Sequence, residues 1–179
     1  MIYVFLAQGF EEIEALATVD ILRRAGLTVK TVGIGGTEIT GSHGITVKAD
    51  MTEQESAQQH PVAVVLPGGL PGADNLNENQ TVSAAITYAA EHGNVIGAIC
   101  AAPYILGRKG LLNGKKAVCY PGYEPQLIGV EIVPDAAVID GNIVTGKGAG
   151  AVFDFALSLV SVLVSPQKAV ELQESMQCR

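Results

Sequence analysis

Short runs of apolar, β-forming residues alternate with helical patterns along this chain, and this alternation constrains the fold more than any other feature. Three of the runs, at 2–7, 62–66 and 95–99, are apolar throughout. A strand without a polar face is buried on both sides, which is typical of a parallel sheet covered by helices. We therefore predict an α/β fold with a doubly wound, mainly parallel sheet, formed by a single domain over residues 1–179.

The other predicted elements follow from periodicity and from glycine or proline at their ends. Helices are predicted at 11–25, 81–92, 101–108, 151–164 and 167–177. Further strands are predicted at 28–34, 116–120, 130–133, 137–139 and 142–145, and a small hairpin or pair of short strands within 39–49. Asp140-Gly141 is a hairpin turn signal between the last two strands.

Composition and charge narrow the function class. The net charge is −7 and no lysine or arginine cluster exceeds two residues, so we expect neither nucleic acid nor membrane as a partner. The apolar run at the N-terminus is too short for a signal peptide, and no window approaches the length of a spanning helix. Three cysteines at no metal spacing fit a reducing compartment, and we predict a cytoplasmic protein.

Three loops that follow predicted strands are unusual, and all three leave the sheet at the same edge. They cover residues 8–14, 67–71 and 100–103. In a doubly wound sheet the ligand site lies beyond the carboxyl ends of the strands. We therefore expect the three loops to meet at one site.

Cys100 lies where a buried strand turns directly into a helix. Ala98 and Ala102 flank it as the small residues flank the nucleophile of a G-x-S-x-G elbow, and Pro103 suits a first helical turn. A helix N-terminus would favour the thiolate, so we predict that Cys100 is a reactive nucleophile. The alternative is a buried structural cysteine, which is our interpretation of Cys119, whereas the near-terminal Cys178 is expected to be incidental.

An acid and two backbone donors are candidates to act with Cys100. Glu11, Glu12 and Glu14 lie in the first turn of the first helix, where the helix dipole alone explains at least two of them. Periodicity allows either Glu12 or Glu14 to point inward. The N–H groups of Gly69 and Ala101 are the natural pair to bind an oxyanion, although Gly68-Gly69 could also be a plain turn.

The histidines and the last glycine-rich turn give weaker signals. His43 could approach the site, whereas His60 and His92 fit a strand start and a helix end, and no metal site is supported. The turn at 146–150 matches neither a dinucleotide nor a Walker pattern, so we interpret it as a tight turn near the site.

Taken in order, five motifs resemble the ThiJ/PfpI superfamily, in particular the branch that contains the Parkinsonism-associated protein deglycase and its bacterial relatives. The motifs are GFEEIE at 9–14, VDILRRAG at 19–26, VVLPGG at 64–69, AICAAP at 98–103 and GKGAG at 146–150. The similarity extends from residue 2 to about residue 164, which is nearly the whole chain. Glu-Glu-x-Glu, Pro-Gly-Gly and Ala-Ile-Cys-Ala in this order are jointly specific.

The resemblance implies a flavodoxin-like sandwich of the class I glutamine amidotransferase-like type, usually as a homodimer. It also implies a reactive cysteine at Cys100, a protonated carboxyl partner at Glu14, and oxyanion amides at Gly69 and Ala101. The alanine at 101 stands where the peptidase branch has a histidine, which argues against a protease or amidase.

Three further departures concern the predicted substrate pocket, which comprises Gly68, His43, Tyr120 and Lys147. Tyr120 stands where the deglycase branch often has a histidine. His43 and Lys147 stand where relatives have arginine. Substrate anchoring is therefore expected to differ from that of the relatives.

The function predicted from the residues and the resemblance is a cofactor-independent cysteine enzyme of the glyoxalase or deglycase type. Its substrate would be a small 2-oxoaldehyde or an early adduct of one. The main alternative is an oxidative-stress redox sensor or chaperone that works through oxidation of Cys100. A flavin- or nucleotide-binding module is a weaker alternative.

Overall fold

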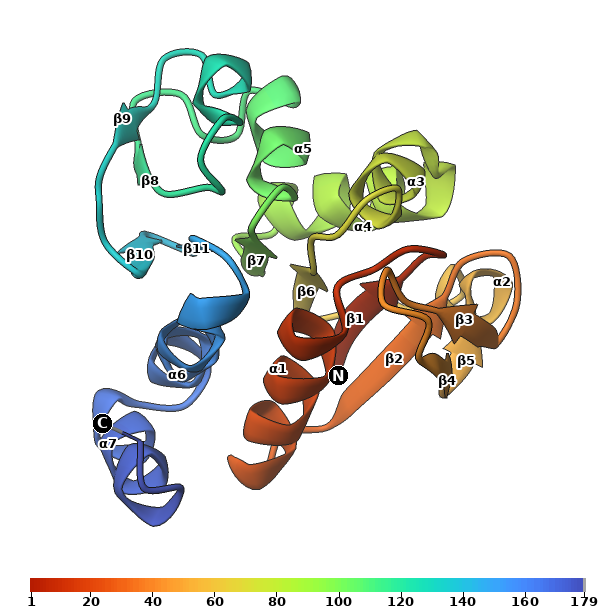
Figure 1. Ribbon diagram of the computed structural model, residues 1–179, viewed down its shortest axis with the longest axis horizontal. Helices are drawn as coiled ribbons and strands as arrows, with labels where there is room; N and C mark the ends of the chain where they lie inside the picture. Colours follow the sequence, from red (N-terminus) through yellow and green to blue (C-terminus); the bar gives the residue numbers. More distant parts are fainter. Residues whose placement is uncertain (179) are drawn as a thin grey trace.

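A seven-stranded sheet forms the centre of the computed structural model, which describes residues 1–178 (Figure 1). The strand order is β10-β11-β7-β6-β1-β2-β5, and all neighbours are parallel except the β10–β11 hairpin at one edge. The strands are β1 (Ile2–Leu6), β2 (Val29–Gly33), β5 (Met51–Thr52), β6 (Ala63–Leu66), β7 (Val95–Ile99), β10 (Ala137–Asp140) and β11 (Ile143–Gly146). The three continuously apolar runs of the sequence thus form the adjacent central strands β1, β6 and β7.

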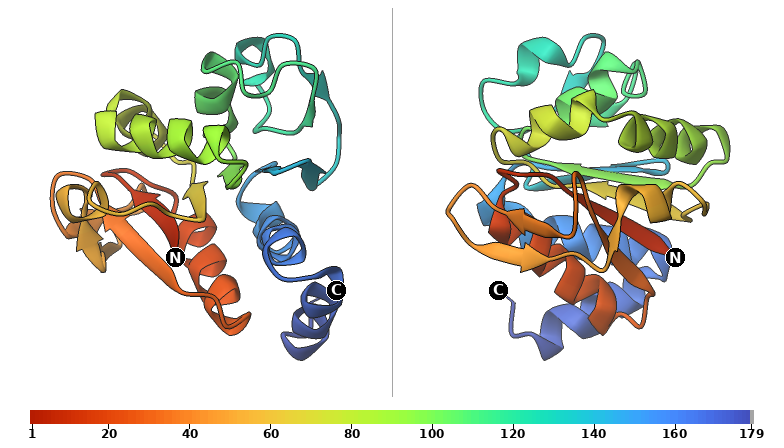
Figure 2. Two further views of the ribbon diagram at one scale, coloured as in Figure 1. Left: turned by 180° about the vertical axis from the view of Figure 1, so that it is seen from behind. Right: turned by 90° about the vertical axis from the view of Figure 1, so that its right-hand side faces the viewer.

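Helices cover both faces of the sheet, as the side view in Figure 2 shows. One face carries α1 (Glu12–Arg24), α6 (Val152–Leu163) and α7 (Pro166–Ser175), and the other carries α3 (Gly72–Glu78), α4 (Gln80–Glu91) and α5 (Pro103–Arg108). Each layer has its own hydrophobic core, because side chains of successive strand residues point to opposite faces. Phe5, for example, packs with the α3–α5 layer and Val4 with the α1 layer. The predicted doubly wound α/β class is confirmed.

The sheet changes winding direction between β1 and β6. The chain leaves β1 through α1 on one face and leaves β6 through α3 and α4 on the other. At such a switch point the two loops diverge and leave a crevice at the carboxyl ends of the strands. The loops after β1, β6 and β7 all end there, so the topology positions the site expected from the sequence.

Several elements differ from those predicted. The hairpin within 39–49 is confirmed as β3 (Glu38–Thr40) and β4 (Thr46–Lys48), which pair antiparallel outside the main sheet. The predicted strand at 116–120 shrinks to β8 (Lys116–Ala117), which pairs only with β9 (Glu131–Ile132). After β8 the backbone N–H groups do not continue the strand pairing. Val118 N–H donates to the hydroxyl of Thr145, and Tyr120 N–H donates to the carbonyl of Cys100.

Some short elements were not predicted at all. The helices α2 (Glu53–Ser56) and α3, and the 3₁₀ turns at Glu124–Gln126 and Ala149–Ala151, lack an amphipathic repeat long enough to detect. α7 begins at Pro166 itself, because proline lacks only an N–H that the first helical turn does not use. Among the described residues, no helix combines the length and the apolar character that a membrane span requires.

Candidate active site around Cys100

Cys100 sits at a sharp turn between β7 and α5. Its φ is +64°, a left-handed conformation that costs a residue with a Cβ on the order of 1–2 kcal/mol. Its N–H donates to the carbonyl of Gly146 on the neighbouring strand and its carbonyl accepts from Tyr120, which fixes the strained peptide from both sides. The strained strand-to-helix elbow predicted from the small flanking residues is present.

The three loops expected to converge do so at Gly68. Its N–H donates to Oε2 of Glu14 at 2.8 Å, and its carbonyl accepts from the N–H of Glu11 at 3.0 Å. A Cβ built on Gly68 would lie 2.6 Å from Cβ of Cys100 and 2.8 Å from Oε2 of Glu14. Only a residue without a side chain leaves the carboxyl and the thiol beside each other.

Glu14 is therefore the acid that faces Cys100, as the family resemblance implied. It is 1% exposed, and burial raises its pKa to about 7, although the Gly68 N–H and a hydrogen bond with the Cys100 side chain oppose the rise. Its other oxygen, Oε1, is buried and has no hydrogen-bond partner among the described residues. An oxygen without a donor is the natural place for a proton, so near pH 7 this carboxyl is poised to hold or release one.

The thiol of Cys100 responds to Glu14 in turn. Burial, together with the charge and hydrogen bonding of ionised Glu14, raises the pKa of Cys100 to about 12, while the N–H groups of Ala101 and Gly69 lower it. The helix N-terminus expected to favour the thiolate belongs to α5, a helix of only six residues, and its influence is outweighed. When Glu14 takes up a proton its charge disappears, and the two N–H groups then favour the thiolate. The pair is thus arranged to share a single proton.

Glu12, the other candidate acid, faces away from Cys100 toward the β3–β4 hairpin. Its carboxylate accepts from the backbone N–H of His43 at 2.8 Å and of Ile45 at 3.3 Å, and its Oε2 lies 2.8 Å from Nδ1 of His43. These bonds hold the pKa of Glu12 at about 2 despite its burial, and the carboxylate in turn raises the pKa of His43. A Cβ on Gly41 would overlap the Glu12 carboxyl, so this close approach also depends on a glycine.

The first turn of α1 and the hairpin together form a small cluster of possible metal ligands. One ligand atom from each of Glu11, Glu12 and His43 lies within 4.8 Å of the others. No spacing in the sequence indicated this cluster, because the hairpin brings its histidine from about 30 residues away. Glu11 and Glu12 already accept hydrogen bonds from Glu14 N–H and His43 respectively.

The four residues predicted to form a substrate pocket separate into two groups. Tyr120 and Lys147 line one cavity of about 560 Å³, together with Pro121, Pro134 and the turn 148–151. The Tyr120 ring packs close to Gly148, and its backbone bond to Cys100 places this cavity next to the elbow. His43 and Gly68 do not line it: His43 pairs with Glu12, and Gly68 separates Glu14 from Cys100.

The remaining cysteines and histidines lie outside this arrangement. Cys119 is 3% exposed in the hydrophobic core, which agrees with its predicted packing role, and all three cysteines are free. His60 and His92 stack on opposite sides of Tyr88. In the described part of the chain, no histidine hydrogen-bonds with Cys100, and His43, which could have approached the site, pairs with Glu12 instead.

The sequence profile of the DJ-1/PfpI family matches residues 1–162. The chain belongs to the DJ-1/PfpI family. Among curated relatives, protein dj-1beta of Drosophila melanogaster is 35% identical over 176 residues, which cover 97% of this chain and 94% of that protein.

Other members of the DJ-1/PfpI family extend the comparison. The glutathione-independent glyoxalase DJR-1.2 of Caenorhabditis elegans is 30% identical and covers 90% of this chain and 87% of its own length. The oxidized structure of Toxoplasma gondii DJ-1 superposes with a TM-score of 0.94 at 31% identity, covering 98% of this chain and 97% of that one. These relatives confirm the predicted family and its flavodoxin-like fold.

Proposed function

We propose that this protein is a cofactor-independent cysteine enzyme that converts small 2-oxoaldehydes into 2-hydroxy acids. The observation that carries the proposal is the buried Glu14 carboxyl beside the strained Cys100 thiol. Its pKa of about 7 suits it to carry a proton near neutral pH. General acid–base groups work best when their pKa lies near the working pH. That a relative is named a glutathione-independent glyoxalase supports the same class of reaction.

The proposed reaction begins with a proton transfer inside the pair. Glu14 takes the thiol proton, and the Cys100 sulfur adds to the aldehyde carbon to give a hemithioacetal. The N–H groups of Gly69 and Ala101, which already favour negative charge on the sulfur, bind the oxygen that becomes negative. Donation of the Glu14 proton to that oxygen regenerates the carboxylate.

The second stage moves hydrogen between the two carbons. Glu14 removes the proton from the former aldehyde carbon and returns it to the adjacent carbonyl carbon. The hydroxyl proton of the hemithioacetal passes to the oxygen of that carbonyl, which gives a thioester of the 2-hydroxy acid. Water then cleaves the thioester, releases the acid and restores the thiol. The sum is addition of one water to the 2-oxoaldehyde, with no external oxidant or reductant, which is consistent with a reaction without a cofactor.

The test is turnover of methylglyoxal by the wild type and by Cys100→Ala. We expect lactate to form with the wild type and its rate to fall at least about 100-fold in the variant, since the nucleophile is lost. Cys119→Ala is the matched control and should retain turnover. Equal lactate formation by wild type and Cys100→Ala would refute the proposal.

A second candidate function, oxidation sensing, draws on the same thiol. Peroxide would oxidise the Cys100 thiolate to a sulfenic acid with release of water, and a second peroxide would give the sulfinic acid. The Ala101 and Gly69 N–H groups and a protonated Glu14 are donors suited to its oxygens. Mass spectrometry after mild peroxide treatment should find Cys100 oxidised before Cys178; the reverse order would argue against this function.

We also propose that the chain forms a homodimer through α1 and the β3–β4 hairpin. Ile13 and Leu16 on α1 are 55% and 38% exposed, and Ile45 in the hairpin turn is 54% exposed. Large apolar side chains grouped on one surface are typical of an interface. Sedimentation velocity should give a dimer for the wild type and a smaller species for Leu16→Glu.

A further inference from the structure

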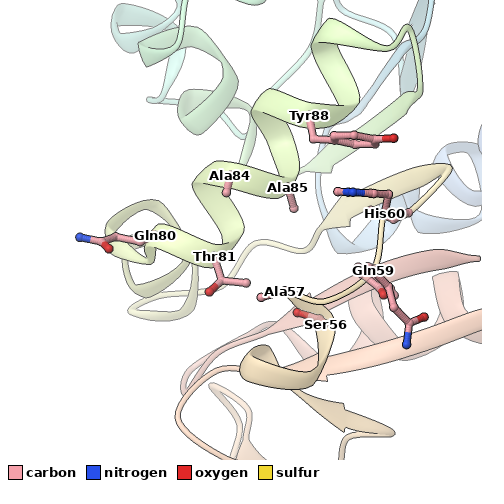
Figure 3. Close-up of a pocket in the computed structure, with 11 residues that line it drawn as sticks. Ser56, Ala57, Gln59, His60, Gln80, Thr81, Ala84, Ala85 and Tyr88 are labelled. Atoms are coloured by element: carbon pink, nitrogen blue, oxygen red, sulfur yellow. The ribbon is translucent and has the colours of Figure 1, made fainter.

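A cavity of about 410 Å³ lies between α4 and the segment that links α2 to β6 (Figure 3). Its lining includes Ser56, Ala57, Gln59, His60 and Pro61 on one side, and Ala84, Ala85 and Tyr88 of α4 on the other. None of its residues belongs to the three loops that meet at Cys100. Its volume lies within the usual range for small-molecule sites.

We call this cavity the α4 pocket, and its lining residues are small, aromatic or neutral polar, with His60 as the one histidine. The lining contains no aspartate, glutamate, lysine or arginine. Its walls are formed by alanine, proline and aromatic surface, and the polar side chains of Gln59, Gln80 and Thr81 are exposed or half-buried. Such a lining favours an uncharged, largely apolar molecule over a phosphate or a carboxylate, which would lose its hydration without gaining a charged partner.

Flat aromatic surfaces border one end of the α4 pocket. The imidazole of His60 stacks on Tyr88 with ring centroids 4.2 Å apart and planes 11° apart, and Figure 3 shows both rings edge-on at the pocket. His92 stacks on the other face of Tyr88 at 3.9 Å. Both faces of Tyr88 are thus covered, so this border offers mainly ring edges, which favour edge-to-face contact with a planar aromatic molecule.

Two buried hydroxyls belong to the wall: that of Ser56 donates to the carbonyl of Glu53, whereas that of Tyr3 has no such partner. Tyr3 is 1% exposed, and its hydroxyl is buried without a hydrogen-bond partner among the described residues. Burial of an unsatisfied hydroxyl costs about 1–3 kcal/mol. Burial also raises the pKa of this phenol, so the hydroxyl keeps its proton and is available as a donor. An otherwise unexplained donor in the wall of an apolar cavity indicates a ligand that carries one acceptor.

We propose that the α4 pocket binds an uncharged, planar ring compound whose single carbonyl oxygen accepts a hydrogen bond from Tyr3. The ring would lie along the alanine face of α4 and meet the aromatic edge formed by His60 and Tyr88. The segment 57–61, which is neither helix nor strand, forms the opposite wall, and binding would require it to shift so that the carbonyl reaches the buried hydroxyl. This site is separate from the Cys100 chemistry and does not depend on the proposed enzyme activity.

Coumarin, an uncharged bicyclic lactone, is a suitable probe. We would titrate it into the ¹⁵N-labelled full-length protein and follow the amide resonances. We expect shifts confined to residues 56–61 and 80–88, and about tenfold weaker binding to Tyr3→Phe, the loss expected for one hydrogen bond. Absence of shifts at these residues, or equal affinity for Tyr3→Phe, would overturn the proposal.

A pair of variants on one helix tests the position. Ala84→Phe fills the α4 pocket and should abolish the shifts, whereas Thr87→Phe, exposed on the same helix but outside the lining, should leave them unchanged. Loss of binding in both variants would contradict the assignment. The alkylation rate of Cys100 should be the same in all of them.

Stability of the empty protein provides an independent measurement. Tyr3→Phe removes a hydroxyl that has no partner, so the melting temperature without coumarin should rise by a few degrees. A fall instead would show that the hydroxyl already has a structural partner, and would overturn the proposal.

Discussion

Glu12 and Glu14 lie two residues apart on α1 and are both buried, yet their acidities differ widely. Glu12 is 4% exposed with a pKa of about 2, and Glu14 is 1% exposed with a pKa of about 7. Burial raises both values. Glu14 lies deeper and is more strongly desolvated, and the donors also differ: the β3–β4 hairpin surrounds Glu12 with two backbone N–H groups and an imidazole, whereas Glu14 receives one backbone N–H and faces a thiol.

This contrast shows that burial alone does not decide whether a carboxyl is structural or reactive. A carboxylate whose lone pairs are occupied by donors stays ionised and joins two elements, here α1 and the hairpin. A carboxyl with too few donors keeps its proton until about neutral pH and can exchange it with a neighbour. Two acids of the same helical turn thus serve different purposes.

The largest expected effect comes from Glu14→Gln. The amide cannot carry a proton between carbons, so turnover of methylglyoxal should fall by about 10²–10⁴-fold, the usual contribution of general acid–base catalysis. Because ionised Glu14 raises the pKa of Cys100, the same variant should show a lower thiol pKa. Iodoacetamide alkylation of Cys100 across pH measures that change.

Glu12→Gln is the matched control for that experiment. Its carboxylate does not contribute to the pKa of Cys100, so both turnover and alkylation should remain near wild-type values while the protein is folded. If the two variants behaved alike, the assignment of separate roles to the two acids would be wrong.

The pH dependence of stability should sharpen the contrast. The folded pKa of Glu14 lies above its usual value of 4.5, so its contribution is fully present below pH 4.5 and is lost as the pH rises through 7. The loss is about 3 kcal/mol. Glu12 behaves oppositely: its pKa is lowered, so its contribution is present above pH 4.5 and is lost as the pH falls toward 2.

Urea denaturation from pH 3 to pH 8 would separate these contributions. Glu14→Gln should flatten the change in unfolding free energy between pH 4.5 and 7, and Glu12→Gln should flatten the change below pH 4.5. An unaltered profile in Glu14→Gln would mean that this carboxyl is not protonated in the folded protein near neutral pH.

The smallest effect is expected for His43→Ala. The imidazole is 68% exposed, and Glu12 keeps its backbone donors from His43 and Ile45 without it. A pair with one solvent-exposed partner contributes little to stability, so the free energy of unfolding at pH 6 should fall only slightly. Loss of methylglyoxal turnover in this variant would place His43 in the substrate pocket after all.

Much of the fold followed from the sequence because its signals are local. The apolar runs that form β1, β6 and β7, and the helical period of α1, can be identified within windows of a few residues. The elbow at Cys100 was equally local, since small residues and a proline surround it. These features required no knowledge of distant contacts.

What the sequence did not reveal depends on residues far apart in the chain. The choice between Glu12 and Glu14 stayed open on periodicity, because it is settled by His43 and Gly68, some 30 and 54 residues away. The expectation of an acidic thiol was wrong for the ionised pair, since the charge of Glu14 acts against it. The division of the predicted substrate pocket likewise required the position of the hairpin.

Gly41 and Gly68 each lie against one of the two acids, where a methyl group would meet the carboxyl. The proton affinity of both acids is therefore open to change by substitutions that alter no charge and remove no hydrogen-bonding side chain. An alanine methyl group at Gly68 would clash with both Glu14 and Cys100, whereas one at Gly41 would clash with Glu12. In variants of this protein, differences in the pH at which Cys100 reacts can thus arise at positions that have no side chain to titrate.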